Sequence, residues 1–394
     1  MASSIDVTKQ LELIKRGAVE VILEEELKKR LEESAKTKKP LIVKAGFDPT
    51  APDIHLGHTV LLRKMRQFQD LGHKAIFLIG DFTGRIGDPS GKSELRKQLS
   101  PQVIAKNAQT YKKQISKILD MRKLQVVFNS KWFDKMKGLE FGKLLTHYTA
   151  TRMLERDDFS LRIKERKPLY MSEFIYPILQ GYDSVVLSAD IELGGTDQKF
   201  NLLVGRDLQK DFGQAPQVVI TMPLLEGTDG VQKMSKSYGN YIGINETPNE
   251  MLGKIMSISD ELMFKYYELL TDEDLGKVKT MHPKEAKLGL AEIIVRQYHS
   301  QKDAHDARLA FERVFSQKEL PKDLPEYKTD GKQNIVSVLL DSGLVKSGNE
   351  ARRLIKQGAV LFSNQKIKDE NYIIDKEGIL KAGSRRFLKV LRGL

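Results

Sequence analysis

Two histidines in the segment "PDIHLGH", residues 52–58, flank a Leu-Gly pair at a spacing that could serve chemistry. His55 and His58 can donate hydrogen bonds to phosphate oxygens, and charge that develops there in a transition state strengthens such bonds. Gly57 lets the backbone approach a ligand closely, and the free amides at the start of a helix attract phosphate. Zinc is disfavoured, because no glutamate or third ligand stands at metal-binding spacing. The segment therefore predicts a phosphate-binding loop rather than a zinc site.

A second polar segment, "DGVQKMSKSYGN" at residues 229–240, carries two lysines in a glycine-bounded loop. Lys233 and Lys236 flank a Met-Ser pair. Two ammonium groups on a flexible loop can clamp pyrophosphate, because lysine acts as a mobile point charge. Alone, the segment would indicate an ordinary exposed basic loop. Beside the histidine segment it favours a nucleotide site.

Short apolar runs predict the sheet that positions these loops. They are "LIVKAG", "KAIFLIG", "LQVVFN", "SVVLSADIELGG" and "QVVITMPLL". Continuous Val, Ile and Leu runs are typical of parallel strands that helices cover on both faces. Between the first two runs, Leu61, Met65 and Phe68 fall at helical spacing, which completes a βαβ unit. The predicted fold class is α/β, with a doubly wound, Rossmann-like parallel sheet whose ligands bind beyond the carboxyl ends of the strands.

The organisation of the chain follows from changes in pattern and composition. A segment with two prolines and many charges near residue 321 is typical of a linker. We expect a helical N-terminal arm over 1–39, a catalytic domain over 40–225 with a helical insertion at about 100–172, a region over 226–320 with the lysine loop and then helices, a linker over 321–331, and a small α+β module over 332–394.

Charge is concentrated in that last module. The whole chain has a net charge of +12, and residues 332–394 hold 13 basic and 6 acidic residues, a net of +7. Such asymmetry favours a polyanion as partner, nucleic acid before an anionic membrane. On charge alone, a solvated basic surface is equally compatible with it.

Several classes of protein are disfavoured by composition. The sequence has no cysteine, which removes disulfides and thiolate metal sites and suits a reducing cytoplasm. No run approaches the ~18 apolar residues that a membrane span needs, and the N-terminal segment lacks the apolar stretch of a secretion signal. We therefore expect a cytoplasmic protein without membrane contact.

The two loops together resemble the paired signatures of class I aminoacyl-tRNA synthetases. "HLGH" stands for the first signature, and "KMSKS" at 233–237 matches the second letter for letter, in the expected order. The segments "GFDPTAPDIHLGH", "GDFTGRIGDPSGKSE", "YPILQGYD" and "GGTDQKFN" narrow the resemblance to bacterial tyrosyl-tRNA synthetases, over essentially the whole chain. In that family a tyrosine carboxylate attacks the α-phosphate of ATP, and the tyrosyl group then passes to the terminal adenosine of tRNA(Tyr). This chemistry needs positioning and charge stabilisation more than acid or base groups.

The resemblance implies roles for particular residues. The catalytic set would be His55, His58, Lys92, Arg96, Lys233 and Lys236. The ATP-binding set would be Asp48, Thr50, Gly57, Gly195, Asp197 and Lys236, with Mg²⁺ accompanying ATP and no zinc. The tyrosine-binding set would be Asp88, Tyr176, Gln180, Asp183 and Gln198, with Asp183 accepting the substrate hydroxyl.

The geometry of the tyrosine set depends on one helix. Tyr176, Gln180 and Asp183 are four and three residues apart, which places them on one face if the segment is helical. Pro177 would weaken or kink that helix. For Tyr176 and Asp183 taken alone, ordinary helix packing and solvation would be the better interpretation.

One position departs from the family pattern. Many members carry a tyrosine, whose phenol also contacts the substrate hydroxyl, where this chain has Lys44. Either Asp183 reads the hydroxyl with another partner, for which Asp81 is a candidate, or Lys44 plays a different part.

The basic module resembles a small RNA-binding module shared with a ribosomal protein and with pseudouridine synthases. Lys346, Arg352, Arg353 and Lys356 would bind phosphates of tRNA(Tyr), which positions RNA without reading bases. The family also implies a homodimer. The alternatives are the related tryptophan enzyme, a non-catalytic RNA-binding protein on the same scaffold, and a nucleotidyltransferase for a small metabolite.

Overall fold

The computed structural model describes residues 6–89, 100–316, 324–329, 332–363, 365–383 and 386–392. The chain divides into two compact units, Met1–Arg308 and Leu309–Leu394. The first unit contains both the predicted catalytic region and most of the helical region that follows it. The second unit contains the predicted basic module.

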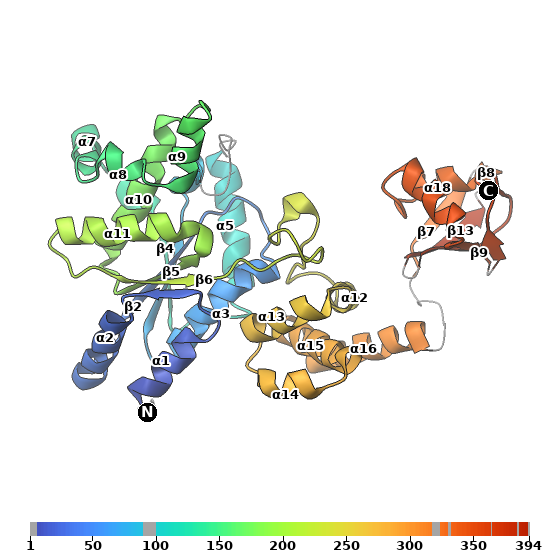
Figure 1. The fold of residues 1–394 in the computed structure, drawn as a ribbon, viewed down its shortest axis with the longest axis horizontal. Helices are drawn as coiled ribbons and strands as arrows, with labels where there is room; N and C mark the ends of the chain where they lie inside the picture. The colour runs from blue at the N-terminus through green and yellow to red at the C-terminus, as the bar shows by residue number, and fades with distance from the viewer. Residues whose placement is uncertain are drawn as a thin grey trace. The chain divides into compact units, whose positions relative to one another are not determined.

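A six-stranded sheet forms the centre of the first unit (Figure 1), in the order β1-β6-β5-β2-β3-β4. The strands are β1 (Glu20–Ile22), β2 (Ile42–Phe47), β3 (Lys74–Ile79), β4 (Leu124–Phe128), β5 (Ile191–Gly195) and β6 (Val218–Met222). Strands β2 to β6 pair in parallel, and β1 pairs antiparallel with β6. Every residue of β6 is buried, as expected for a strand covered on both faces. The predicted parallel sheet is confirmed.

Helices cover the two faces of this sheet (Figure 1), with α3 (Leu56–Asp70) on one face and α10 (Met171–Leu187) and α11 (Lys199–Asp211) on the other. From β2 the chain moves through α3 to β3, whereas from β5 it moves through α11 to β6, in the opposite direction along the sheet. Right-handed crossovers in opposite directions place their helices on opposite faces. The direction reverses between β2 and β5, which is where doubly wound sheets bind ligands.

The N-terminal arm contains a strand that the sequence did not predict. Helices α1 (Val7–Lys15) and α2 (Glu24–Thr37) are present, but β1 between them adds an antiparallel edge to β6. Three residues are too few to show a strand period beside two longer amphipathic helices.

The run "SVVLSADIELGG" is also only partly a strand. Its first residues end α10, and Ser188, at a φ of 47°, terminates that helix before β5 begins at Ile191. Val185 packs with Val204 and Leu208 of α11 in one apolar cluster. Tertiary packing therefore overrides the β-propensity of the two valines.

Helices occupy most of the insertion and of the region after the lysine loop. The insertion consists of α5 (Pro101–Ile115), α6 (Ser130–Phe133), α7 (Gly138–Leu145), α8 (Ala150–Met153) and α9 (Asp157–Lys164), with β4 between α5 and α6. After the lysine loop come α12 (Pro248–Met256), α13 (Asp260–Leu270), α14 (Leu275–Thr280), α15 (Pro283–Tyr298) and α16 (Gln301–Ser316).

The second unit is a small α+β fold around a five-stranded sheet in the order β10-β9-β12-β13-β7. Its elements are β7 (Glu326–Thr329), β8 (Gln333–Asn334), α17 (Ile335–Asp341), α18 (Gly348–Lys356), β9 (Val360–Phe362), β10 (Gln365–Ile367), β11 (Ile373–Ile374), β12 (Gly378–Ala382) and β13 (Arg386–Arg392). Strand β7 pairs in parallel with β13, although the sequence predicts a linker over 321–331. Its four residues, "EYKT", are polar, and only a partner distant in sequence makes them a strand.

Candidate active site

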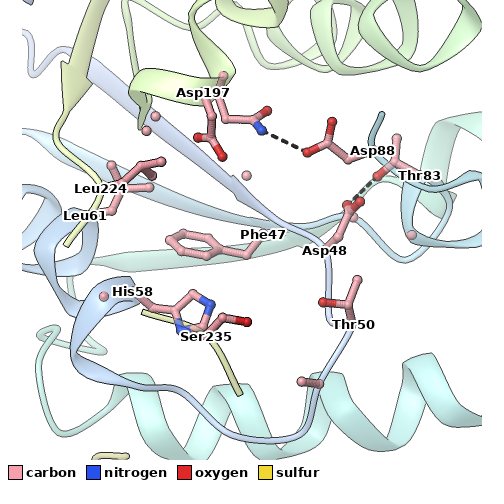
Figure 2. Close-up of a pocket in the computed structure, with 18 of the residues that line it drawn as sticks. Phe47, Asp48, Thr50, His58, Leu61, Thr83, Asp88, Asp197, Leu224 and Ser235 are labelled. Atoms are coloured by element: carbon pink, nitrogen blue, oxygen red, sulfur yellow. Dashed lines mark hydrogen bonds between the residues drawn. The ribbon is translucent and has the colours of Figure 1, made fainter. Parts of the chain in front are cut away.

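A cavity of about 750 Å³ lies beyond the carboxyl ends of β2, β3 and β5 (Figure 2). Every described residue of the predicted catalytic, ATP and tyrosine sets lines it: Asp48, Thr50, His55, Gly57, His58, Asp88, Tyr176, Gln180, Asp183, Gly195, Asp197, Gln198, Lys233 and Lys236. Lys92 and Arg96 lie outside the described residues.

The two histidines stand at the start of α3 as neutral rings. The His55 backbone N–H donates to His58 Nδ1 over 3.2 Å, and the ring centroids lie 3.8 Å apart. Burial, then the charge of Lys236, lowers the pKa of His58 to about 4, and burial with His58 and Lys236 lowers that of His55 to about 2. Since His58 Nδ1 accepts a hydrogen bond, its proton is on Nε2. Near neutral pH His58 is therefore an uncharged donor.

The lysine loop lies across the start of this helix. Met234 is 5% exposed, and its sulfur accepts a hydrogen bond from the Gly57 backbone N–H over 3.3 Å. Lys233 Nζ lies 3.3 Å from Asp197 Oδ2, and Lys236 pairs with Asp53. Figure 2 shows Ser235 of this loop beside His58. The buried methionine thus anchors the loop while the lysines on either side face the cavity.

Two glycines keep the middle of the cavity open. A Cβ atom on Gly195 would stand 2.6 Å from Asp197 Oδ1, and one on Gly80 would stand 2.0 Å from Asp48 Oδ1. Asp48 accepts hydrogen bonds over 2.8 Å from Thr83 Oγ1, which Figure 2 shows, and from Tyr176 Oη. The sequence reasoning missed Gly80, although a glycine after a buried strand is a usable signal.

The predicted tyrosine-binding residues line the part of the cavity formed by α10 and by the segments that follow β3 and β5. Helix α10 runs unbroken from Met171 to Leu187 with Pro177 inside it, and presents Tyr176, Gln180 and Asp183 to the cavity. Asp88 accepts a hydrogen bond from Gln198 Nε2 over 2.8 Å (Figure 2). The predicted common face therefore survives the proline.

Asp183 is 2% exposed and accepts two hydrogen bonds. Trp132 Nε1 donates to Oδ1 over 3.0 Å, and Asn129 Nδ2 donates to Oδ2 over 3.3 Å. Burial raises the pKa of Asp183 to about 8, against the opposing effects of Lys44, Asn129 and Trp132. The sequence reasoning missed Asn129 and Trp132, which follow β4 at the carboxyl edge of the sheet.

Lys44 is fully buried, and its ammonium group is occupied. Nζ lies 2.9 Å from Glu192 Oε1, and it donates to Ser184 Oγ over 2.7 Å and to the Gln180 carbonyl over 3.4 Å. Two N–H groups of this ammonium are hydrogen-bonded within the fold, and its charge is paired with Glu192. Asp81 is absent from the lining of the cavity and accepts from the Ser130 N–H instead. The structure therefore does not bring Asp81 together with Asp183 in the cavity.

The predicted RNA-binding side chains lie in the second unit. Lys346, Arg352, Arg353 and Lys356 are exposed, while Leu354 and Ile355 of α18 are buried in the core of that unit. The helix is thus amphipathic, with a basic outer face.

The doubly wound sheet, the histidine pair at a helix start and the lysine loop across it define a nucleotide-binding enzyme of the class I synthetase type. The family described as tRNA synthetases class I (W and Y) matches residues 36–316, and the tyrosine–tRNA ligase SYY-like C-terminal domain matches residues 316–393. The chain belongs to this family of aminoacyl-tRNA synthetases.

Similar proteins of known name support the same assignment. A tyrosine–tRNA ligase of Carboxydothermus hydrogenoformans is 55% identical over 98% of each chain, and one of Aquifex aeolicus is 53% identical over 98% of this chain and 99% of its own. Among solved structures, a tyrosyl-tRNA synthetase from Archaeoglobus fulgidus complexed with L-tyrosine is 25% identical, with a TM-score of 0.62 over 77% of this chain and all of that one. Within the described parts of the chain, no helix is long and apolar enough to cross a membrane.

Proposed function

We propose that the chain is a tyrosine–tRNA ligase that activates L-tyrosine with ATP and transfers it to tRNA(Tyr). The observation that carries this proposal is that one cavity joins the lysine loop and the histidine pair to a buried acceptor, Asp183. The lysines and histidines suit the phosphates of ATP. The buried carboxyl group of Asp183 suits the hydroxyl of a phenol. An indole N–H can also donate to a buried carboxylate, so the choice of tyrosine over tryptophan rests on the similarity to tyrosine–tRNA ligases over 98% of this chain.

In the first step the tyrosine carboxylate attacks the α-phosphorus of MgATP, and the bond to the β-phosphate breaks to release pyrophosphate. Asp48, Thr50, Gly57, Gly195 and Asp197 hold the nucleotide. His55, His58, Lys233 and Lys236 stabilise the charge that develops on the phosphates, together with Lys92 and Arg96, which belong to this proposal by sequence alone. No group in this set has to exchange a proton, because the nucleophile is already ionised at neutral pH.

Tyrosine itself binds between α10 and the loop after β3. Asp88, Tyr176, Gln180 and Gln198 surround its ammonium and carboxylate groups, and Asp183 accepts the hydrogen bond of its hydroxyl. Because Asp183 must otherwise stay buried with an unused acceptor, the pocket should reject phenylalanine strongly.

In the second step a ribose hydroxyl of the terminal tRNA adenosine attacks the tyrosyl carbonyl carbon, and the adenylate leaves as AMP. The region over 226–320 and the basic face of α18, with Lys346, Arg352, Arg353 and Lys356, bind the tRNA through its phosphates. The enzyme works in the cytoplasm, where charged tRNA is consumed.

The active form is a homodimer. Four large apolar side chains at the end of the insertion are exposed, namely Leu161, Ile163, Tyr170 and Met171. The ion pair between Arg162 and Glu173, which is buried, ties α9 to the start of α10, and these are the two segments that carry the four side chains. Exposed apolar residues gathered in this way mark an interface, which a mass measurement in solution would reveal.

The experiment that tests the proposed function is ATP–pyrophosphate exchange with a panel of amino acids, followed by tRNA charging. Tyrosine should support exchange, while tryptophan and phenylalanine should not. Exchange with tryptophan would assign the other branch of the family. Exchange with no amino acid would favour a non-catalytic RNA-binding protein.

A further inference from the structure

Each lysine of the lysine loop is paired with a carboxylate that lines the cavity. Lys233 pairs with Asp197, and Lys236 pairs with Asp53. Asp197 already has a part in the proposed function, as a group that holds the nucleotide. Asp53 has none, although it lies only two residues before His55.

Asp53 stands on a firmly held stretch of backbone. The Ile54 N–H donates to Gln114 Oε1 over 2.8 Å, Gln114 Nε2 donates to the Pro52 carbonyl over 2.8 Å, and Asn107 Nδ2 donates to the Pro49 carbonyl over 2.8 Å. Gln114 and Asn107 are buried side chains of α5. The carboxylate is therefore a fixed partner, and the long Lys236 side chain is the member of the pair that can move.

The pair itself is weakly held. The side chain of Asp53 is 47% exposed and that of Lys236 is 27% exposed. Ion pairs in contact with water contribute little stability and exchange partners readily. A triphosphate, which carries more charge and more acceptor oxygens than one carboxylate, can displace Asp53 from Lys236.

We propose that Asp53 is a positioning residue that occupies the phosphate-binding ammonium of Lys236 between turnovers. Before ATP binds, it holds that ammonium at the start of α3, close to the histidine pair. When ATP binds, phosphate oxygens take the place of the Asp53 carboxylate, and when pyrophosphate leaves, Asp53 takes Lys236 back. This inference rests on the proposed function, because it names a competitor for the same phosphates.

The consequence for binding follows from competition. If Lys236 spends most of its time on Asp53, the apparent dissociation constant of a phosphate ligand rises by the inverse of the free fraction. Asp53→Asn removes the competing charge and keeps the size of the side chain. We expect it to tighten the binding of ATP and pyrophosphate by about three- to tenfold, the range that a free fraction of roughly 0.1 to 0.3 implies. Slower loss of pyrophosphate should follow.

The test is a cycle of four proteins: the parent, Asp53→Asn, Lys236→Ala and the double variant. Equilibrium binding of MgATP and of inorganic pyrophosphate is measured for each by calorimetry. The gain from Asp53→Asn should be present with Lys236 and absent in the Lys236→Ala background. Asp53→Glu, which keeps the charge, should bind like the parent and serves as the matched control.

Three results would overturn the inference. An equal gain in both backgrounds would mean that Asp53 acts through its general field and not through Lys236. Weaker binding by Asp53→Asn would mean that Asp53 supports the bound state, and unchanged binding would mean that it does not compete. Because calorimetry needs no amino acid, these results stay distinct from failure of the proposed function, which tyrosine-dependent exchange by the parent protein decides.

Discussion

Asp183 is the residue on which the choice of amino acid rests. Its carboxylate is buried, and both oxygens are already oriented by Trp132 and Asn129. Each oxygen has a lone pair left to accept a substrate hydroxyl. The nearby Lys44 is already held by Glu192, Ser184 and Gln180. In the proposed pocket Asp183 therefore takes the hydroxyl without help from the position where many relatives carry tyrosine.

Replacing Asp183 with asparagine should therefore reduce the preference for tyrosine over phenylalanine. We expect the ratio of the two kcat/KM values to fall by about a hundredfold or more, because a site built for a hydroxyl discriminates by about 10⁴–10⁵ and the variant replaces one carboxyl oxygen with an amide NH₂ donor. The measurement is pyrophosphate exchange with each amino acid. Asp81→Asn is the matched control, since Asp81 lies outside the cavity lining and should leave the ratio unchanged. A variant at position 183 that still rejects phenylalanine like the parent would exclude this role.

His58 makes the stability of the folded protein depend on pH in a direction that its pKa determines. The folded pKa of His58 is lowered to about 4 by burial and by Lys236, whereas an unfolded histidine titrates near 6.5. The unfolded chain therefore binds a proton between these values that the folded chain does not, and stability is lost as the pH falls from about 6.5 towards 4.

His58→Asn should remove this part of the dependence. Its unfolding free energy should fall less than that of the parent between pH 7 and pH 5, by a total of about 2 kcal/mol over that range. Asparagine keeps a hydrogen-bond donor, so this variant should also retain more activity than His58→Ala. Denaturant titration at several pH values decides the first point. Equal slopes for parent and variant would mean that His58 is already protonated in the folded protein at pH 5.

At the scale of elements, a buried ion pair connects β2 and β5 in addition to their backbone hydrogen bonds. Lys44 and Glu192 are partners in the parallel register of these strands, and both side chains are buried. Removing one member leaves an uncompensated charge in the interior, which is far more costly than removing both.

Lys44→Met should thus destabilise the protein by about 3–5 kcal/mol, and the double variant Lys44→Met, Glu192→Met should recover much of that loss. Urea denaturation measures both. Arg66→Met is the control, since the pair Arg66–Asp70 lies on the exposed side of α3 and should cost less than about 0.5 kcal/mol. If the double variant were less stable than Lys44→Met, the strands would depend on the polar groups themselves and not on charge balance.

The sequence predicted those parts of the fold and site that depend on local signals. The apolar runs predicted β2, β3 and β6, and the histidine and lysine segments predicted the loops that line the cavity. It did not predict β1 or β7, which are short and become strands only by pairing with β6 and β13. Nor could it predict that Lys44 pairs with Glu192 or that Trp132 supports Asp183, because each pair joins elements far apart in the chain. The roles of Lys92 and Arg96 stay predictions.

At the scale of the whole molecule, the two units should separate the two chemical steps. The family match changes at residue 316, and the second unit has its own apolar core. A chain ending at residue 316 stops before β7, which begins at Glu326 and pairs with β13 of the same unit. This shorter chain should keep pyrophosphate exchange and lose most tRNA charging.

The salt dependence of tRNA binding shows whether tRNA charging is lost because contacts to tRNA phosphates are lost. The removed module carries a net +7 over residues 332–394, and phosphate contacts weaken in proportion to the number of phosphates neutralised. The shorter chain should therefore bind tRNA with a shallower dependence on salt than the full chain. Loss of exchange would mean that the module supports the catalytic fold, and unchanged charging would mean that its charge is only a solvated surface.

The position of Trp132 gives the molecule an optical reporter of its own. It is the single tryptophan among 394 residues. Its indole N–H donates a hydrogen bond to Asp183, the residue proposed to receive the substrate hydroxyl. Indole emission responds to the charge and polarity next to the ring, so tyrosine should change the fluorescence of the unlabelled enzyme at the moment its hydroxyl reaches Asp183. Phenylalanine, which brings no hydroxyl, should leave a different emission. Rapid mixing could then follow recognition of the substrate separately from the chemistry at the other end of the cavity.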